Sequence, residues 1–145
     1  MARVNTYLNF QGNTEEAFKF YETVFNSKIT SLTRMKDLPR PEGAPQVTPE
    51  DAEKIMNVQL PIMNGHIIMA TDFLESMGHK LIVGNNTTIS LDFDSKEEAQ
   101  RVYDLLAVGS EQFSPMADMP WGAFWGSALD QYGVRWMLSY EYPRN

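Results

Sequence analysis

The sequence predicts an α+β fold: a single domain made of two repeated βαβββ modules, about residues 1–80 and 81–145. Three observations predict it. Several segments alternate between apolar and polar residues as strands do, two segments carry the apolar stripe of a helix, and the same order of elements recurs in both halves. We expect the modules to form a cup-shaped mixed sheet with the helices on its outer face. A length of 145 residues suits one domain.

The first half begins with a strand and an amphipathic helix. Residues 5–10 alternate between two faces, as expected of a strand. Asn13 is a predicted N-cap with Glu16 three residues later as a capping box, so we expect a helix over 13–26. Its apolar stripe consists of Ala17, Phe20, Tyr21 and Val24.

Three more strands are predicted in the first half, at 29–35, 54–61 and 66–73. The last two form a hairpin, because Asn64-Gly65 between them is a strong turn signal. The segment 38–51, between the predicted strands 29–35 and 54–61, contains four prolines. Proline fits neither the hydrogen-bonded interior of a sheet nor the interior of a helix. This segment is therefore predicted to be a long surface loop.

The second half repeats the pattern. Ser95 and Glu98 predict a capped helix over 95–108, which follows a strand at 87–93. The helix stripe consists of Ala99, Val102, Tyr103 and Leu106, and strand-like segments follow at 111–117, 123–129 and 134–142.

The two halves match at an offset of 82 or 83 residues in the first strand and helix, and of 68 residues at the end of each half. Tyr21 matches Tyr103 in the helices, Leu8 matches Leu91 in the first strands, and Met69 matches Met137 in the last strands. Any two amphipathic helices share such a stripe, which is the alternative explanation. Recurrence of strand, cap, helix and final strand in the same order favours a genuine repeat.

Strand alternation predicts which side chains line the cup between the modules. Apolar residues of each strand must face the helices, so the alternate residues face the cup, which becomes a mixed and mostly polar surface of the kind that binds small molecules. The predicted ligand-binding residues are Tyr7, Asn9, Met69, Ser90, Asp92, Trp125, Arg135 and Met137. A slip of one residue in register would send each side chain to the opposite face.

Three segments carry a resemblance to a known family: residues 12–21 after the first strand, residues 130–136 before the last, and the Pro-Trp-Gly-Ala-Phe-Trp-Gly stretch at 120–126. With them the chain resembles the glyoxalase/bleomycin-resistance/extradiol-dioxygenase (vicinal oxygen chelate) superfamily, in its PhnB-like branch. That branch often carries the label 3-demethylubiquinone-9 3-methyltransferase. The resemblance implies paired βαβββ modules and a homodimer, but the fold hosts many activities.

Metal-dependent members of that superfamily carry His, Gln or Glu at four cup-facing positions. Matching by motif places these positions at about Asn5, Met69, Thr88 and Met137. None of the four is a good ligand for a hard or borderline divalent metal. We therefore expect no metal and no other cofactor.

Two groups of residues have competing interpretations. Arg135 is either an anion anchor beside an acid–base Asp92, or the partner of Asp92 in an ion pair at the cup rim, and we favour the ion pair. Trp121, Phe124 and Trp125 either stack on a flat ligand or belong to the core or a dimer interface. His66 and His79 form no obvious pair, so neither a histidine metal site nor a histidine base is supported.

Composition excludes several classes of function. The formal net charge of −7 disfavours nucleic-acid binding. No stretch approaches the about 18 apolar residues of a membrane span. The chain lacks cysteine and its first residues are polar, without a signal-peptide pattern, so we expect a cytoplasmic protein with no membrane or nucleic-acid partner.

Two functions remain. The first is a small-molecule-binding protein whose ligand the sequence does not identify. The alternative is an enzyme of the same superfamily (lyase-, isomerase- or dioxygenase-like) on a small oxygenated substrate, with Asp92 or Tyr7 transferring a proton and Arg135 as anchor. A methyltransferase is not expected, because the chain contains no Gly-x-Gly of the turn that binds S-adenosylmethionine.

Overall fold

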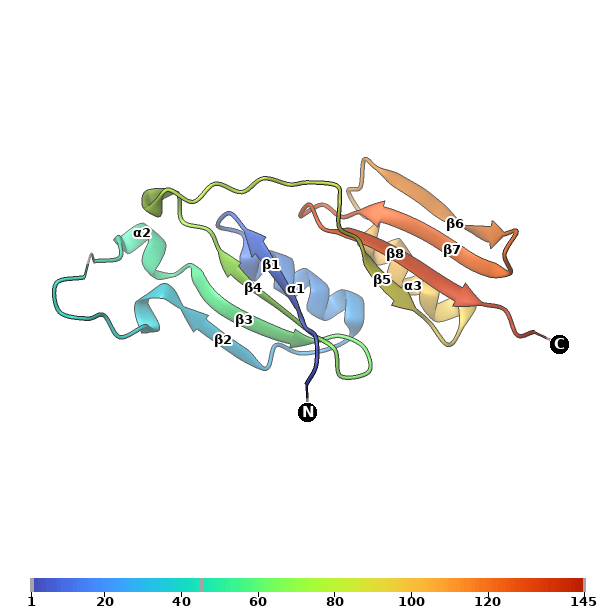
Figure 1. The fold of residues 1–145 in the computed structure, drawn as a ribbon, viewed down its shortest axis with the longest axis horizontal. Helices are drawn as coiled ribbons and strands as arrows, with labels where there is room; N and C mark the ends of the chain where they lie inside the picture. Colours follow the sequence, from blue (N-terminus) through green and yellow to red (C-terminus); the bar gives the residue numbers. More distant parts are fainter. Residues whose placement is uncertain (1, 45, 145) are drawn as a thin grey trace. The chain divides into compact units, whose positions relative to one another are not determined.

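Each half of the chain folds around its own sheet. The computed structural model describes residues 2–44 and 46–144. The chain divides into two compact units, Met1–Ile82 and Val83–Asn145, here called the N-terminal and C-terminal modules. Each module has a four-stranded sheet and one long helix against one face of that sheet (Figure 1).

The N-terminal module contains a mixed sheet in the order β1-β4-β3-β2. Strands β1 and β4 are parallel, and the other neighbours are antiparallel. Its elements are β1 (Thr6–Phe10), α1 (Thr14–Phe25), β2 (Ser31–Arg34), a 3-10 helix (Met35–Asp37), α2 (Pro49–Ala52), β3 (Ile55–Pro61), β4 (Ile67–Asp72) and a second 3-10 helix (Glu75–Met77).

The C-terminal module repeats this topology in the order β5-β8-β7-β6. Its edge strand β5 is parallel to the neighbouring strand β8, as β1 is to β4. Its elements are β5 (Ile89–Asp92), α3 (Lys96–Leu106), β6 (Phe113–Met119), β7 (Ala123–Leu129) and β8 (Arg135–Glu141). The prediction of an α+β fold with two βαβββ units is confirmed.

The long helices bury one face of each sheet. In the C-terminal module the predicted stripe of α3 is buried as a whole, over Trp136 and Leu138. In α1 the prediction is wrong at one position. Phe18 is fully buried and makes edge contacts with Phe10 and Tyr21, while Phe20 lies only partly buried at the side of the stripe.

The two helices begin differently. The Ser95 hydroxyl accepts the Glu98 N–H at 3.1 Å, as predicted for α3. The Asn13 side chain makes no capping hydrogen bond, so the predicted capping box of α1 is wrong. A buried carboxylate from the end of β4 takes its place: Asp72 Oδ1 accepts the N–H groups of Gly12 and Thr14, each at 3.0 Å. A distant acceptor of this kind leaves no local sequence signal.

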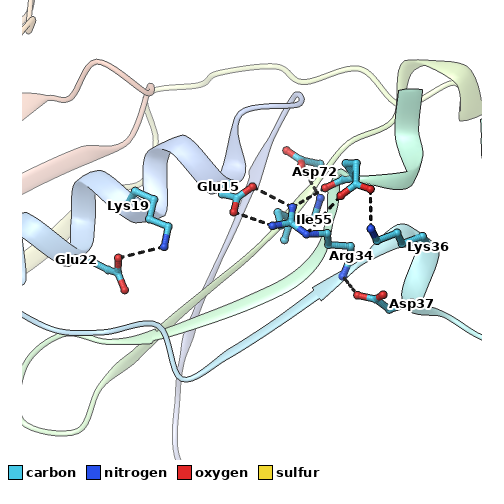
Figure 2. Close-up of polar contacts among 9 residues, drawn as sticks. Glu15, Lys19, Glu22, Arg34, Lys36, Asp37, Ile55 and Asp72 are labelled. Atoms are coloured by element: carbon cyan, nitrogen blue, oxygen red, sulfur yellow. Dashed lines mark hydrogen bonds and ion pairs between the residues drawn. The ribbon is translucent and has the colours of Figure 1, made fainter. Parts of the chain in front are cut away.

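The connection from β2 to β3 contains more structure than the predicted loop. Residues 38–44 and 46–48 form the loop, and Pro45 of the predicted loop lies outside the described residues. Pro49 begins the short helix α2, where proline is tolerated because the first helical N–H needs no partner. The Arg34 guanidinium ties this region to α1 by hydrogen bonds of 2.8 and 2.9 Å to the Glu15 carboxylate (Figure 2). Within the described residues, no helix has both the length and the apolar character needed to cross a bilayer.

Candidate functional site

Each sheet has a second face, turned away from its long helix and here called the distal face. In the N-terminal module it carries Tyr7, Asn9, Gln59, Met69 and Thr71, and in the C-terminal module Ser90, Asp92, Trp125, Ser127, Arg135, Met137 and Ser139. All eight residues predicted to bind ligand have distal-face positions. Those of one module lie on neighbouring strands.

The N-terminal distal face contains two rows of side chains. Tyr7 of β1 lies opposite Met69 of β4, which lies opposite Gln59 of β3. Asn9 lies opposite Thr71 in the next row. Tyr7 is 48% exposed although it belongs to a strand, so the ring is available to contact another molecule.

The C-terminal distal face contains two equivalent rows. Ser90 lies opposite Met137, which lies opposite Ser127. Asp92 lies opposite Ser139, which lies opposite Trp125. Met137 thus occupies the register position of Met69, and each methionine sits in the middle of an uncharged row.

Two distal-face residues were not predicted from the sequence. Gln59 and Ser127 belong to β3 and β7, and both line these rows. The same alternation in residues 55–61 and 123–129 identifies them once the register is known.

The favoured ion pair between Asp92 and Arg135 is not formed. Asp92 is at the end of β5 beside Ser139, whereas Arg135 begins β8, two side-chain rows away on the same face. Arg135 instead donates to the carbonyl oxygen of Gly84 and to Oε1 of Gln112, both at 3.3 Å.

The structure separates the three aromatic residues that the sequence analysis grouped together. Trp121 and Trp125 contact each other edge to face, with ring centroids 6.3 Å apart, and Trp121 is 61% exposed. Phe124 points to the helix side, where Lys96 Nζ lies 4.6 Å from its ring centroid. Of these three aromatic side chains, only Trp121 and Trp125 are therefore available to a ligand.

Two cavities are associated with the sheets. One, of about 330 Å³, lies beyond the carboxyl end of β4 beneath the proline-rich loop and is lined mainly by apolar groups, among them Leu38, Phe73, Leu74 and Met77. The other, of about 240 Å³, lies within the C-terminal module and includes Arg135, Thr88, Ser114 and Ser127. One cavity is mainly apolar and the other mainly polar.

Both histidines are bonded within the N-terminal module. His66 Nε2 is 2.9 Å from the Thr6 hydroxyl oxygen, on the helix side of the sheet. His79 Nδ1 accepts the Leu74 N–H at 3.2 Å, and its ring lies against Phe73. Neither ring lies beside a distal-face serine or threonine, so among the described residues the distal faces contain no hydroxyl–histidine pair.

Ionisable groups with shifted pKa values lie away from the distal faces. The hydrogen bonds from Arg34 lower the pKa of Glu15. Those from Ser76 and Lys54 lower the pKa of Asp51. Burial raises the pKa of Tyr103, whose hydroxyl donates to the carbonyl oxygen of Ser114 at 3.0 Å. Glu15 and Tyr103 join helices to sheet strands, and Asp51 joins α2 to the second 3-10 helix through Ser76, so these groups are structural.

The residues at the four metal positions do not suit a divalent metal. Met69 and Met137 offer soft thioethers and Thr88 a neutral, exposed hydroxyl. Asn5 Oδ1 is a buried acceptor without a hydrogen-bond partner in the described part of the chain, but one amide oxygen makes no metal site. Among residues 2–44 and 46–144 no three His, Cys, Asp or Glu side chains gather to hold an ion.

The two βαβββ modules have a known fold. A glyoxylase/bleomycin resistance protein/dioxygenase domain from Frankia sp. EAN1pec has the same fold at a TM-score of 0.66 and 11% identity, over 98% of each chain. By sequence, the chain belongs to the family described as 3-demethylubiquinone-9 3-methyltransferase, whose sequence model matches residues 2–139.

Two solved structures from other bacteria are more similar in sequence. Protein PA1353 from Pseudomonas aeruginosa is 29% identical, with a TM-score of 0.81 over 97% of this chain and 98% of its own. The PhnB protein from Bacillus cereus is 25% identical, with a TM-score of 0.74 over 96% of this chain and 99% of its own. The PhnB-like assignment made from residues 12–21, 120–126 and 130–136 is thus confirmed.

Proposed function

We propose that this chain is a PhnB-like protein that binds a small molecule against its distal faces without transforming it. One observation carries the proposal: both modules present matched rows of mainly uncharged polar side chains around a methionine, with Tyr7, Asn9 and Ser90 exposed. A few convergent polar groups on a partly apolar surface are typical of ligand sites. Methionine adapts its shape to irregular partners.

Two further features support this proposal. The apolar cavity of about 330 Å³ beyond β4 is large enough for a ring or a short aliphatic group. Immediately before β1, the buried Asn5 Oδ1 has no donor within the described residues, and a ligand N–H or O–H would satisfy it.

Catalysis has less support than binding. The serines and threonines of the distal faces lack a neighbouring histidine, because His66 and His79 are bonded elsewhere. The methyltransferase in the family description has no support either: both sheets are mixed, and the chain lacks the glycine-rich turn of the common methyltransferase fold.

Substitution of Ser90 tests the proposal. We expect Ser90→Trp to abolish retention of a small molecule while changing stability little, because Ser90 is an exposed residue. Native mass spectrometry of protein purified from its own organism measures retention. Glu97→Trp, on the exposed side of α3, adds the same bulk elsewhere and serves as control.

Two outcomes would contradict the proposal. If the wild-type protein retains no compound and none from a metabolite extract binds, the distal faces are not a ligand site. If Ser90→Trp unfolds the protein while Glu97→Trp does not, Ser90 is a packed residue and the surface is part of a core.

The assembly proposed for this protein is a homodimer. Large apolar side chains that are more than half exposed support it, including Ile82, Phe113 and Trp121. Light scattering at micromolar concentration should give about twice the chain mass of 16.6 kDa, and a particle of 16.6 kDa alone would exclude the dimer. We also propose a cytoplasmic location, from the cysteine-free composition, to be checked by cell fractionation.

A further inference from the structure

Arg135 lacks the acidic partner that Arg34 and Arg101 have. Arg34 pairs with Glu15 at 2.8 Å and Arg101 with Glu98 at 2.6 Å. Arg135 forms no ion pair within the described residues. Its two hydrogen bonds are long, at 3.3 Å, and go to neutral oxygens of Gly84 and Gln112.

This arrangement is unusual for a chain in which acidic residues outnumber basic ones by 19 to 12. Arg135 is partly buried, and the residues that line the cavity around it include no Asp or Glu that could neutralise its charge. The cationic cavity is therefore suited to an anion from outside the chain.

Hydroxyl groups complete the cavity. Thr88, Ser114 and Ser127 line it together with Arg135, and their hydroxyls form no hydrogen bond with the described residues. Each is therefore available to donate. A planar guanidinium binds two oxygens of a carboxylate or phosphate side by side, and hydroxyls satisfy the remaining oxygen lone pairs.

We propose that this cavity of the C-terminal module binds the oxyanion group, a carboxylate or a phosphate-type group, of a small ligand. The inference rests on the proposed function and deepens it by naming the ligand class. A volume of about 240 Å³ suits a small charged group, while the rest of the ligand extends over the Ser90–Met137 row.

The test is a titration followed by NMR chemical shifts, with inorganic phosphate and acetate as separate probes and chloride at equal ionic strength as reference. We expect saturable shifts at Thr88, Ser114 and Ser127 with at least one oxyanion, and the stronger of the two identifies the class. Arg135→Gln should weaken binding at least about tenfold, because a hydrogen bond to a charged group is lost. Arg135→Lys, which keeps the charge but not the planar fork, should weaken it less.

Arg144→Gln is the matched control, because it changes the net charge equally at an exposed position of the same module. Equal binding by Arg135→Gln and wild type, with unchanged melting temperatures, would overturn the inference, as would non-saturable shifts with both probes. Loss of ligand retention in Ser90→Trp but not in Arg135→Gln would remove the anion site and leave the proposed function intact. Loss in neither variant would remove the proposed function itself.

Discussion

The two modules share one topology but differ in the connection between their second and third strands. In the N-terminal module residues 35–54 join β2 to β3 and contain a 3-10 helix, the proline-rich loop and α2. In the C-terminal module residues 120–122 alone join β6 to β7. The long connection covers an apolar cavity, whereas the C-terminal module has a cationic one. One connection and a few side chains thus give two modules of the same topology cavities of different polarity.

Substitution of a buried carboxylate is expected to change the stability of the protein most. Asp72 accepts hydrogen bonds from Gly12, Thr14 and Ile55, whereas Asp130 accepts them within one turn and from Trp136 Nε1. Asp72→Ala should lower the free energy of unfolding by about 3–5 kcal/mol, because several buried donors lose their acceptor. Urea denaturation measures it. Asp92→Ala, at an exposed site, should stay within about 0.5 kcal/mol. A loss below about 1 kcal/mol in Asp72→Ala would show that water replaces the carboxylate.

Substitution of a glycine in β7 is expected to have the next largest effect on stability. Gly126 occupies the register position that Val58 has in β3, but a Cβ atom there would lie 2.9 Å from the backbone nitrogen of Met116 in the irregular strand β6. Gly126→Ala should destabilise the protein by about 1–3 kcal/mol through overpacking. In thermal denaturation, Gly84→Ala is the control, since its Cβ would meet only Asn86 Oδ1 at 3.7 Å. Equal melting temperatures for both variants would contradict the crowding argument.

Acid should affect the N-terminal module first. The pKa values of Glu15 and Asp51 are lowered there, against Glu98 alone in the C-terminal module. A carboxylate with a lowered folded-state pKa stabilises at neutral pH, and this contribution is lost as pH falls from its ordinary value near 4 through the folded-state pKa. Amide exchange between pH 5 and 3 should therefore rise first in the N-terminal module. Glu15→Gln should flatten that pH dependence by less than about 1 kcal/mol, because the ion pair is partly exposed. Glu16→Gln, the control, should leave that pH dependence unchanged. An earlier rise of amide exchange in the C-terminal module would contradict the prediction.

The smallest effect on stability is expected where the distal faces differ most. Tyr7 and Ser90 occupy equivalent positions, both exposed. The exchange variant Tyr7→Ser/Ser90→Tyr should change the free energy of unfolding by less than about 1 kcal/mol and alter which compounds bind. Thermal-shift screening of one compound library against both proteins measures this. Identical binding profiles would show that neither side chain contacts a ligand.

Periodicity was sufficient to predict the strands, the two long helices and most of the faces that they bury. The stripe at Ala99, Val102, Tyr103 and Leu106 and the alternation around Ser90 predict burial correctly, because both depend on local spacing. The Asn13 capping box failed because Asp72, distant in sequence, supplies the acceptor. The predicted ion pair between Asp92 and Arg135 is wrong because alternation gives the face of a side chain but not its row. The row depends on strand register.

The hydrogen bonds of Asp72 to segments distant in sequence also affect the order of folding. Its carboxylate joins the turn before α1 and the start of β3 to the end of β4. During synthesis, β1 and α1 leave the ribosome well before residue 72, so the turn that starts α1 then lacks its acceptor. Contacts between distant segments form slowly, because a long loop must close first. We therefore expect the N-terminal module to stay without fixed tertiary structure until β4 has emerged, and then to fold in one cooperative step.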